Sequence, residues 1–452
     1  MLDVIFREYD IRGLYKSELN EKSVKTIGYL LGLEIKKRGY NNVSVGFDAR
    51  YSAQELFNYL LSGLNYADID VYNLGLVPTP LGYFSLFYGK KFDANIMITG
   101  SHNPKDYNGF KITINKESFF GKELKEFGIK VKNNLNLNIK DNTKHQNYDI
   151  VSKYIDFISD QFSHLKNMDF KFAIDCANGA SGYVILELIK KLNLNAKVLF
   201  ADPNGNFPNH APDPTEIKNL KHLQTLLNDD NTFKMGFAFD GDADRLVVLN
   251  KDHIFCGDEL CYLLAKNIPN PRVLGEVKCS KNLFDEVSKF GTILMSKTGH
   301  SNIKKMMQEY NIDLAAEVSG HIFFKHRYFG YDDGIYAFLR VLELIYQGFD
   351  LYNMIQSLPK LYTSEEIKIP VLENEKFKLI NKFIKIIKDN KTICIKNICE
   401  IDGIRIDFGY GWALLRASNT SPYLIARFET NKYELTQNLK TKILSLLEEI
   451  RK

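Results

Sequence analysis

Three aspartates stand at alternate positions in the segment FDGDADR, at Asp240, Asp242 and Asp244. In an extended backbone this spacing turns all three carboxylates to one side. Two carboxylates about 4 Å apart repel by roughly 4 kcal/mol at an effective dielectric constant near 20, so a buried triplet is costly without a cation. Apolar, strand-like residues flank the triplet and place it in the interior, at the edge of a sheet. We therefore favour a divalent metal site over the alternative, a solvated acidic turn.

The ligand chemistry narrows the choice of metal. Carboxylate oxygens are hard ligands that suit Mg²⁺ or Ca²⁺ better than Zn²⁺. An EF-hand calcium loop also begins D-x-D-x-D, but here its sixth position is Arg245 instead of glycine and its twelfth is Lys251 instead of glutamate. The segment is therefore not an EF-hand. The six cysteines show no C-x-x-C pair and no histidine spacing that indicates zinc.

A serine occupies a second notable loop, TGSHNPKDYNGFK at residues 99–111, directly after the apolar run NIMI. The chain contains no G-x-x-x-x-G-K-S/T phosphate loop. A hydrolase elbow requires G-x-S-x-G, whereas His102 and Asn103 follow Ser101, and we expect that a sequence neighbour cannot reach back as a catalytic base. Two interpretations remain. The loop is either a well-formed turn or the site of a serine that accepts and donates a phosphoryl group beside a divalent metal.

The elements that must position these loops alternate between strands and helices. Residues 44–50 predict a strand, and the helix that follows is predicted to be capped by Ser52. Strands alternating with helices predict mostly parallel sheets, whose functional loops gather at the carboxyl ends of the strands. The three most polar strand exits are residues 98–104, 239–245 and 316–321. The pattern predicts three related α/β domains with mixed, mostly parallel sheets, and a smaller α+β domain after about residue 370.

The length of 452 residues exceeds what one hydrophobic core can hold. We interpret the polar stretches at 136–149, 251–255 and 357–370 as linkers. The predicted domains are 1–148, 149–253, 254–361 and 362–452.

Charge and hydropathy exclude some classes of partner. The net charge is +4 and the lysines are scattered, so the sequence does not suggest a nucleic-acid-binding surface. No stretch approaches the roughly 18 apolar residues of a membrane span, and the amino terminus lacks the apolar run of a signal peptide. We expect a cytoplasmic protein with neither nucleic acid nor membrane as a partner.

Seven motifs together resemble one known family. In order they are FREYDIRG, TGSHNPKDYNGFK, DGDADR, VKCSKNL, KTGHSNIKK, AEVSGHIFF and RASNTSPYLIARFE. Over nearly the whole chain they are similar to the alpha-D-phosphohexomutases, and within these to the bacterial phosphomannomutase/phosphoglucomutase branch. The resemblance implies a heart-shaped molecule in which four domains each give one loop to a central cleft. It also implies hexose phosphate substrates, Mg²⁺, and glucose 1,6-bisphosphate as activator, and we expect a monomer.

The resemblance assigns roles to individual residues. Ser101 is implied to be the phosphoserine and to hold Mg²⁺ together with the three aspartates. Arg245 and Lys111 are expected beside the transferred phosphoryl group, and Arg12 and His300 among the remaining catalytic residues of the cleft. The implied substrate-binding residues are Tyr9, Lys278, Glu317, Ser319, His321, Arg416, Ser418, Asn419, Thr420 and Arg427. Of these, Glu317 and Ser319 are expected to hold the sugar hydroxyls. A phosphate clamp, supported by Arg427, is expected to consist of Arg416, Ser418, Asn419 and Thr420.

The implied reaction interconverts the 6-phosphates and 1-phosphates of mannose and glucose through a hexose 1,6-bisphosphate. The sugar loop departs from the GEMSGH usual in this branch, because Ala316 replaces the glycine and Val318 the methionine. Phosphoglucosamine mutases usually have GEQSGH, so this activity remains an alternative. A sugar bisphosphatase that uses the same phosphoserine is a second alternative, and a non-catalytic sugar-phosphate-binding protein is a third.

Overall fold

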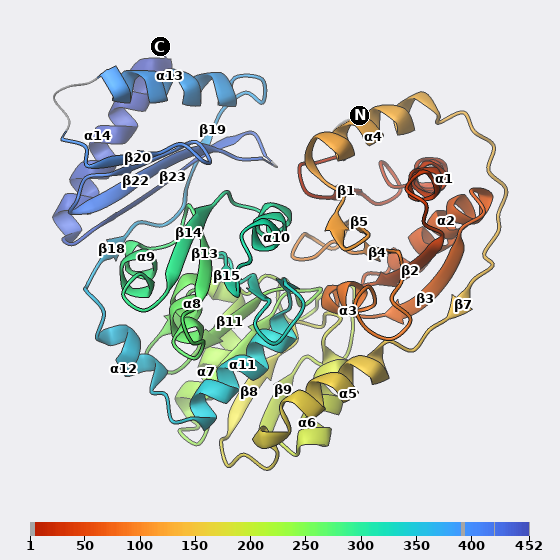
Figure 1. The fold of residues 1–452 in the computed structure, drawn as a ribbon, viewed down its shortest axis with the longest axis horizontal. Helices are drawn as coiled ribbons and strands as arrows, with labels where there is room; N and C mark the ends of the chain where they lie inside the picture. Colours follow the sequence, from red (N-terminus) through yellow and green to blue (C-terminus); the bar gives the residue numbers. More distant parts are fainter. Residues whose placement is uncertain (1–4, 390–393, 420, 452) are drawn as a thin grey trace. The chain divides into compact units, whose positions relative to one another are not determined.

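The computed structural model describes residues 5–389, 394–419 and 421–451, and the chain divides into two compact units. Unit 1 contains Met1–Gly257 and Ser319–Phe349, and unit 2 contains Asp258–Val318 and Asp350–Lys452. Figure 1 shows both units coloured along the sequence, with labels on many of their helices and strands. The residues predicted as a third domain, 254–361, are therefore shared between the two units.

The first sheet of unit 1 contains the strand that leads into the serine loop. Its strands run in the order β1-β5-β4-β2-β3-β7, and β6 pairs with β5. Strand β2 is parallel to β3 and β4, whereas β5 is antiparallel to β4 and β1. The strands are β1 (Ile11–Leu14), β2 (Asn42–Phe47), β3 (Asp70–Leu76), β4 (Ala94–Ile98), β5 (Tyr107–Ile114), β6 (Glu117–Ser118) and β7 (Gln146–Asn147).

Helices pack on both faces of this sheet. Successive residues of β4 point to opposite faces, so this strand contacts helices on both sides. Ile96 and Ile98 lie in a core with residues of α1 (Glu21–Lys37), α2 (Ala53–Tyr66) and α4 (Gly121–Asn133). Asn95 and Met97 lie against Gly82 of α3 (Thr79–Phe84). All residues of β4 are buried, so packing on both faces fixes the strand end from which the serine loop starts.

The second sheet of unit 1 holds the aspartate loop, between β10 and β11. Its order is β12-β11-β10-β8-β9, with β8 parallel to β9 and β10 and the remaining pairs antiparallel. One face packs on Leu223 of α7, and the other on Phe338 of α11, whose ring centroid lies 4.8 Å from that of Phe237. The strands are β8 (Phe172–Asp175), β9 (Ala196–Leu199), β10 (Met235–Phe239), β11 (Leu246–Leu249) and β12 (Ile254–Phe255). The other elements here are α5 (Val151–Gln161), α6 (Gly182–Leu192), α7 (Lys221–Asp229), α11 (Gly334–Tyr346), two short 3₁₀ helices (Ser163–Leu165 and Ile217–Leu220), and the antiparallel pair β16 (Ile322–Phe324) and β17 (Tyr331–Asp332).

Unit 2 begins with three parallel strands in the order β14-β13-β15. They are β13 (Arg272–Glu276), β14 (Thr292–Ser296) and β15 (Leu314–Ala316). The helices of this part are α8 (Gly257–Ala265), α9 (Lys281–Val287), α10 (His300–Glu309) and α12 (Leu351–Gln356).

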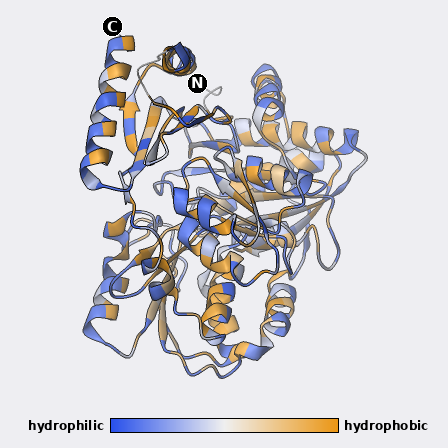
Figure 2. Ribbon diagram, turned by 60° about the vertical axis from the view of Figure 1, so that its left-hand side comes forward, coloured by the Kyte–Doolittle hydropathy of each residue, from blue (hydrophilic) through white to orange (hydrophobic). Residues whose placement is uncertain are grey.

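The last sheet, also in unit 2, is antiparallel, with the order β18-β23-β22-β21-β20 and β19 paired to β23. In Figure 2 the terminal helix α14 alternates between hydrophilic and hydrophobic residues, and its buried residues include Leu439, Ile443 and Leu447. These pack with α13 on the sheet, which confirms the predicted smaller α+β region. The elements are β18 (Tyr362–Thr363), β19 (Ile367–Pro370), α13 (Lys376–Asp389), β20 (Asn397–Cys399), β21 (Ile404–Asp407), β22 (Gly411–Ala417), β23 (Tyr423–Thr430) and α14 (Tyr433–Arg451).

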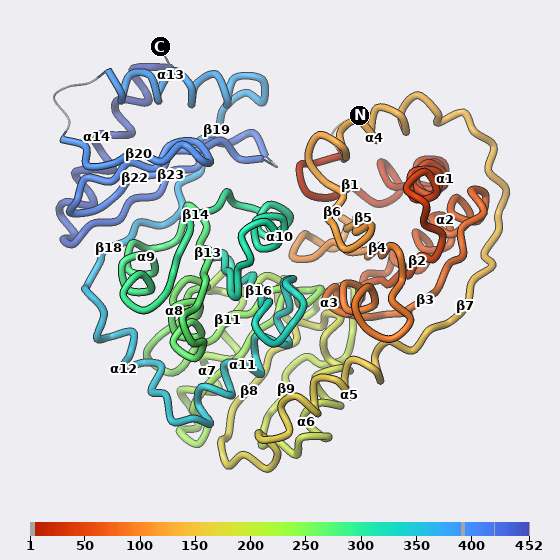
Figure 3. Tube along the Cα trace, in the orientation of Figure 1, coloured from red at the N-terminus to blue at the C-terminus, as the bar shows by residue number. Residues whose placement is uncertain are grey.

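The predicted linkers carry more structure than their composition indicates. Figure 3 shows the connection from α4 to α5 following the outside of the first sheet. Within it, Asn142 O accepts a hydrogen bond from Asn65 Nδ2 at 2.8 Å, and β7 pairs with β3. The stretches 251–255 and 357–370 likewise include β12, and β18 with β19. Within the described residues, no helix combines the length and the hydrophobicity needed to cross a bilayer.

One local prediction is wrong. Ser52 precedes α2 as predicted, but its side chain does not cap the helix. Its hydroxyl instead accepts a hydrogen bond from Nδ2 of Asn108 at 2.8 Å. The reason is tertiary, because a residue far away in sequence occupies the hydroxyl that the local pattern assigned to the helix.

Candidate active site

The serine loop begins where β4 ends and is held by a buried acid. Ser101 has φ of 48°, a left-handed conformation that is uncommon for a residue other than glycine. Its backbone N–H donates to Oγ1 of Thr99 at 2.7 Å, and that hydroxyl donates to Oδ2 of Asp48 at 2.8 Å. The N–H of Gly100 donates to the same oxygen at 3.0 Å. Asp48 therefore fixes the strained turn that carries the buried serine.

Arg50 completes the support of this loop. Its guanidinium donates to four backbone carbonyls, those of Ser101 (2.8 Å), Asn103 (2.5 Å), Pro104 (2.6 Å) and Tyr107 (2.9 Å). It also lies 3.2 Å from Oδ2 of Asp48. A β-carbon on Gly100 would lie 2.2 Å from the guanidinium carbon, so glycine is required there for this close approach.

The three aspartates converge in the loop between β10 and β11, and all three are fully buried. The loop is not extended as predicted, because Ala243 has φ of 57° and its N–H donates to Asp240 O at 3.1 Å. The extended conformation predicted for this segment is therefore wrong, although the three carboxylates converge as predicted. The hydroxyl of Ser101 donates to Oδ2 of Asp240 at 2.9 Å. A β-carbon on Gly241 would lie 2.6 Å from Ser101 O, so this glycine allows the two loops to meet.

Lys111 on β5 neutralises part of the acidic cluster. Its Nζ donates to Oδ2 of Asp242 at 2.7 Å and also to Asp244. Burial alone would lower the pKa of Lys111, but these two carboxylates hold it well above its ordinary value. Burial raises the pKa of Asp240 well above its usual range, and the charges of Asp244 and Asp242 add to this effect.

The donor set fits a divalent metal. One ligand oxygen from each aspartate lies within 4.8 Å of the other two. Oδ1 of Asp242 is buried and accepts no hydrogen bond from any described residue, so it has lone pairs that a cation can use. Carboxylate oxygens beside a serine hydroxyl are ligands that Mg²⁺ prefers.

Arg245 follows the triplet and is oriented by His321, near the start of β16. Its Nε donates to Nε2 of His321 at 2.9 Å, which requires the ring hydrogen to be on Nδ1. That nitrogen lies 3.0 Å from Oδ2 of Asp332 and 3.5 Å from Oδ1 of Asp244. The structure therefore brings Arg245 and His321 into one site with the aspartates.

His102 departs from the sequence argument. Its Nδ1 lies 3.3 Å from Oγ of Ser101, so the expectation that a neighbouring residue cannot reach the serine is wrong. The left-handed turn at Ser101 brings the two side chains to the same side. The charge of Arg245, then burial, holds the pKa of His102 well below its ordinary value. A neutral imidazole therefore lies beside the hydroxyl.

The amino-terminal segment reaches the same loop. Arg12 on β1 donates from Nη1 to Oδ1 of Asn103 at 3.3 Å and pairs with Asp10. Tyr9 is half-buried just before this strand. Ser319 is half-buried in the second chain segment of unit 1.

The remaining predicted residues lie in unit 2, where Glu276 at the end of β13 organises the loops. Glu276 is fully buried and accepts from Val318 N–H at 3.0 Å and from Oγ1 of Thr298 at 2.7 Å. Nζ of Lys278 lies 3.7 Å from Oε1 of Glu276 and 3.2 Å from Oε2 of Glu366. Oε1 of Glu317 accepts from Gly299 N–H at 2.7 Å, next to His300, the first residue of α10.

The residues predicted to form a phosphate clamp begin with Arg416, near the end of β22. Nε of Arg416 donates to Oδ2 of Asp402 at 2.9 Å. The same oxygen accepts from Thr298 N–H at 3.0 Å, so Asp402 connects Arg416 to the loop before His300. The segment continues through buried Ser418 and half-buried Asn419, and Thr420 lies outside the described residues. Nη1 of Arg427 donates to Lys278 O at 3.1 Å.

Comparison with known proteins decides the family. Models of the four phosphoglucomutase/phosphomannomutase domains match residues 3–145, 152–253, 256–362 and 366–446 in order. The chain belongs to the phosphoglucomutase/phosphomannomutase family. It is 38% identical over 447 residues to the phosphomannomutase/phosphoglucomutase of Pseudomonas aeruginosa, covering 97% of this chain and 94% of that protein. It is 34% identical to the phosphoglucomutase of Neisseria meningitidis, with 98% and 96% covered. A solved structure of a family protein from Burkholderia thailandensis has a TM-score of 0.91 at 33% identity, with 99% and 98% covered.

Membership of this family confirms the resemblance drawn from the seven motifs, the fold class, and the interpretation of the chain as a phosphohexomutase enzyme. Sequence reasoning missed three residues that position the phosphohexomutase loops, namely Asp48, Arg50 and Glu276. Each lies at or just after a strand exit, in FDAR or GEVK, where a charged residue after an apolar run is the only local signal. Their partners lie too far away in the sequence for that signal to identify them.

Proposed function

We propose that the protein interconverts the 1-phosphates and 6-phosphates of mannose and glucose through a phosphoserine at Ser101. The observation that carries the proposal is the 2.9 Å hydrogen bond from the Ser101 hydroxyl to Asp240, within a buried carboxylate triplet. A serine displayed on a strained turn beside a metal-binding cluster has the chemistry of a phosphoryl carrier. The names of the relatives support the choice of mannose and glucose.

The reaction consists of two phosphoryl transfers. In the first, the bond between phosphorus and Oγ of phosphorylated Ser101 breaks, and a new bond forms to the free hydroxyl of a hexose monophosphate. The proton of that hydroxyl passes to a base in the site, and the released Oγ of Ser101 takes up a proton. The products are free Ser101 and hexose 1,6-bisphosphate. After the bisphosphate turns over, the bond between its other phosphoryl group and the sugar oxygen breaks, and that group bonds to Oγ of Ser101. The serine hydroxyl gives up its proton to a base in the site, and the released sugar oxygen takes up a proton.

The charges of the site support these transfers. Lys111 and Arg245 stabilise negative charge on the moving phosphoryl group, and Arg12 and His300 are the other catalytic candidates. Asp240, Asp242, Asp244 and Ser101 would hold Mg²⁺, which supplies further positive charge to that group when bound. The substrate-binding residues are proposed to be Tyr9, Lys278, Glu317, Ser319, His321, Arg416, Ser418, Asn419, Thr420 and Arg427.

Loss of the bisphosphate intermediate explains why the enzyme needs an activator. A bisphosphate that escapes leaves Ser101 without its phosphoryl group, and such an enzyme cannot start another cycle. Added glucose 1,6-bisphosphate restores the phosphoserine. We also propose that the protein acts as a monomer of 52.0 kDa, because one unit of a single chain contains both the serine and the aspartates. Light scattering checks this mass.

The decisive experiment measures phosphoryl uptake. We expect incubation with glucose 1,6-bisphosphate and Mg²⁺ to add one phosphoryl group to the peptide of residues 99–111, as detected by mass spectrometry. Ser101→Ala should take up none and lose at least about 10³-fold in turnover, because no carrier remains. Ser288→Ala, at an exposed serine of unit 2, is the matched control. Full turnover by Ser101→Ala would contradict the assignment.

A second assay decides between the substrates. The enzyme is given mannose 1-phosphate, glucose 1-phosphate or glucosamine 1-phosphate, each with Mg²⁺ and a trace of bisphosphate. We expect isomerisation of the first two. Turnover of glucosamine 1-phosphate alone would indicate a phosphoglucosamine mutase. Stoichiometric inorganic phosphate without isomerised sugar would indicate a bisphosphatase.

A further inference from the structure

Two arginines of the last sheet hold the backbone of the loop that carries Lys278. Nη1 of Arg405 on β21 donates to Val277 O at 2.6 Å and to Cys279 O at 2.8 Å. Nη1 of Arg427 on β23 donates to Lys278 O at 3.1 Å. Three successive carbonyls are therefore bound by guanidinium groups. Hydrogen bonds from a charged donor are stronger than those between neutral groups, so this loop has little freedom to move.

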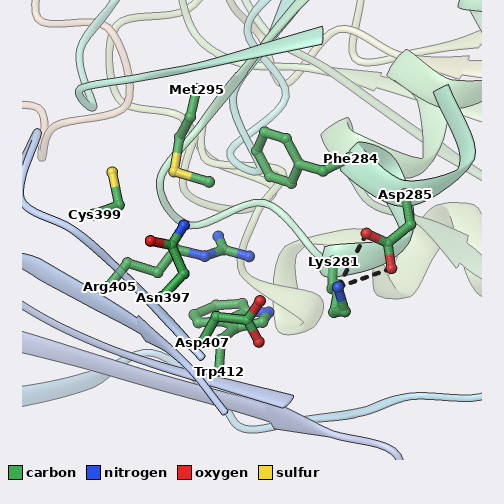
Figure 4. Close-up of a pocket in the computed structure, with 9 residues that line it drawn as sticks. All are labelled: Lys281, Phe284, Asp285, Met295, Asn397, Cys399, Arg405, Asp407 and Trp412. Carbon is green, nitrogen blue, oxygen red and sulfur yellow. Dashed lines mark hydrogen bonds and ion pairs between the residues drawn. The ribbon is translucent and has the colours of Figure 1, made fainter. Parts of the chain in front are cut away.

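Arg405 is itself held in place by stacking. Its guanidinium carbon lies 3.8 Å from the centre of the Trp412 ring and 5.3 Å from that of Phe284. Figure 4 shows these side chains around a pocket of about 200 Å³, which Met295 and Cys399 also line. The guanidinium is therefore positioned by its hydrogen bonds and by the ring of Trp412.

The same strands hold the loop at a second point. Oε1 of Glu429 on β23 accepts from Nε1 of Trp412 at 2.7 Å and from Lys281 N–H at 2.8 Å. Oε2 of Glu429 accepts from Oγ1 of Thr363 at 2.8 Å. Trp412 therefore connects the stack on Arg405 to the carboxylate that binds the next part of the loop.

Lys278 and Arg416 belong to one electrostatic environment. Burial would lower the pKa of Lys278, whereas Glu276 and Glu366 raise it, and the charge of Arg416 opposes them. Arg416 lies on β22, the strand that also carries Trp412. The stacked pair of Arg405 and Trp412 therefore links the loop that carries Lys278 to β22, the strand that carries Arg416.

From these contacts we infer that Arg405 is a positioning residue for Lys278. It fixes the backbone on both sides of Lys278 relative to β22, so that Lys278 and Arg416 present their charges to the same anionic substrate. The inference rests on the proposed function, in which both residues bind a hexose phosphate. Arg405 itself touches loop carbonyls and aromatic rings, and its effect on substrate passes through Lys278.

The test compares Arg405→Met with Arg272→Met. Arg272, at the opposite end of β13, also donates to backbone carbonyls, Tyr310 O at 2.8 Å and Asn311 O at 3.2 Å, so it controls for the loss of such bonds alone. We expect Arg405→Met to raise KM for glucose 1-phosphate about 10-fold, to change kcat by less than about 2-fold, and to leave phosphoryl uptake by Ser101 intact. Arg272→Met should leave KM unchanged. Trp412 is the single tryptophan of the chain, so its fluorescence reports whether the stack has been removed.

A double-mutant cycle with Lys278→Ala completes the test. If Arg405 acts through Lys278, the double variant has the KM of Lys278→Ala alone. The inference would be overturned if the effects of the two substitutions on KM multiplied, as independent effects do. It would also be overturned if Arg405→Met altered the fluorescence but left KM unchanged. Either result would leave the mutase activity of the parent in place. No mutase activity in the parent would instead overturn the proposed function. If Arg405→Met does not fold, Arg405→Lys retains the charge but not the donor geometry, and the same criteria apply.

Discussion

At the scale of single residues, the site is a balance of buried charges. Lys111 contacts Asp242 and Asp244, while the Ser101 hydroxyl donates to Asp240. Three buried carboxylates would repel one another strongly without a cation, so the lysine makes the cluster tolerable when no metal is bound.

Replacing Lys111 by an uncharged residue tests this balance of charge. We expect Lys111→Met to lower the free energy of unfolding by about 3 kcal/mol, because it leaves buried carboxylates without their partner. Mg²⁺ should then raise the melting temperature more in the variant than in the parent, since the ion replaces the missing charge. Thermal unfolding with and without Mg²⁺ measures both effects. Lys25→Met removes another lysine that pairs with two acids, Glu21 and Asp141, and serves as control. An equal response to Mg²⁺ in Lys111→Met and the parent would contradict this account.

Arg50 holds the backbone of the serine loop with a single side chain. Lysine cannot reproduce the fork that binds the carbonyls of the serine loop, because its three donors radiate from one atom. Arg50→Lys should therefore lower the rate of phosphoryl uptake at Ser101 by about 10- to 100-fold, as expected for a displaced reacting group. Single-turnover phosphorylation by glucose 1,6-bisphosphate provides the rate. Arg38→Lys, at the end of α1, makes the same substitution in a partly exposed ion pair and serves as the control, which should react like the parent. The idea fails if both variants react like the parent.

At the scale of elements, the amino terminus of α11 connects several parts of unit 1. The carboxylate of Asp333 accepts from Tyr336 N–H at 2.9 Å, from the Tyr154 hydroxyl at 2.9 Å and from the Tyr328 hydroxyl at 2.7 Å. Burial is the main cause that raises the pKa of Asp333 to about 6. Because this buried cap has a folded pKa that differs from its unfolded value, it makes stability depend on pH.

The sign of that dependence follows from proton binding. Between the unfolded pKa near 3.8 and the folded value of about 6, the folded state holds the proton more tightly. The contribution of protonated Asp333 to the free energy of unfolding is therefore complete below about pH 3.8 and is lost as the pH rises through about 6. Relative to Asp333→Asn, the parent should lose up to about 3 kcal/mol between pH 4 and pH 7.

Urea denaturation at several pH values measures this difference. Asp350→Asn changes the exposed acid that caps α12 and provides the reference for a solvated cap. A difference between the parent and Asp333→Asn that stays constant with pH would show that this carboxyl group does not titrate as described.

At the scale of the whole molecule, the candidate residues are divided between the two units. Ser101, the aspartates, Lys111, Arg245 and His321 lie in unit 1, whereas Lys278, Glu317 and Arg416 lie in unit 2. The residues proposed to carry and transfer the phosphoryl group thus belong to one unit, and most of those proposed to hold the substrate belong to the other.

This division predicts where metal binding acts. Mg²⁺ should slow amide hydrogen exchange in residues 99–111 and 239–245, because a ligand that binds the folded site opposes its local opening. Residues 404–417 of unit 2 should exchange at the same rate with and without Mg²⁺. Hydrogen exchange followed by mass spectrometry gives both values. Protection confined to unit 2 would remove the basis for placing the metal at the aspartates.

The sequence alone determined the family and the alternation of strands and helices, and it predicted the roles of Ser101 and the aspartates. These features are local, because a turn, an apolar strand or an acidic triplet is written in a few consecutive residues. Only the tertiary structure decided that Asn108 takes the Ser52 hydroxyl, that Arg50 holds the serine loop, and that Arg405 and Arg427 bind the carbonyls around Lys278. Hydrogen bonds between residues tens or hundreds of positions apart leave no spacing pattern in a single sequence, since folding alone brings their donors and acceptors together.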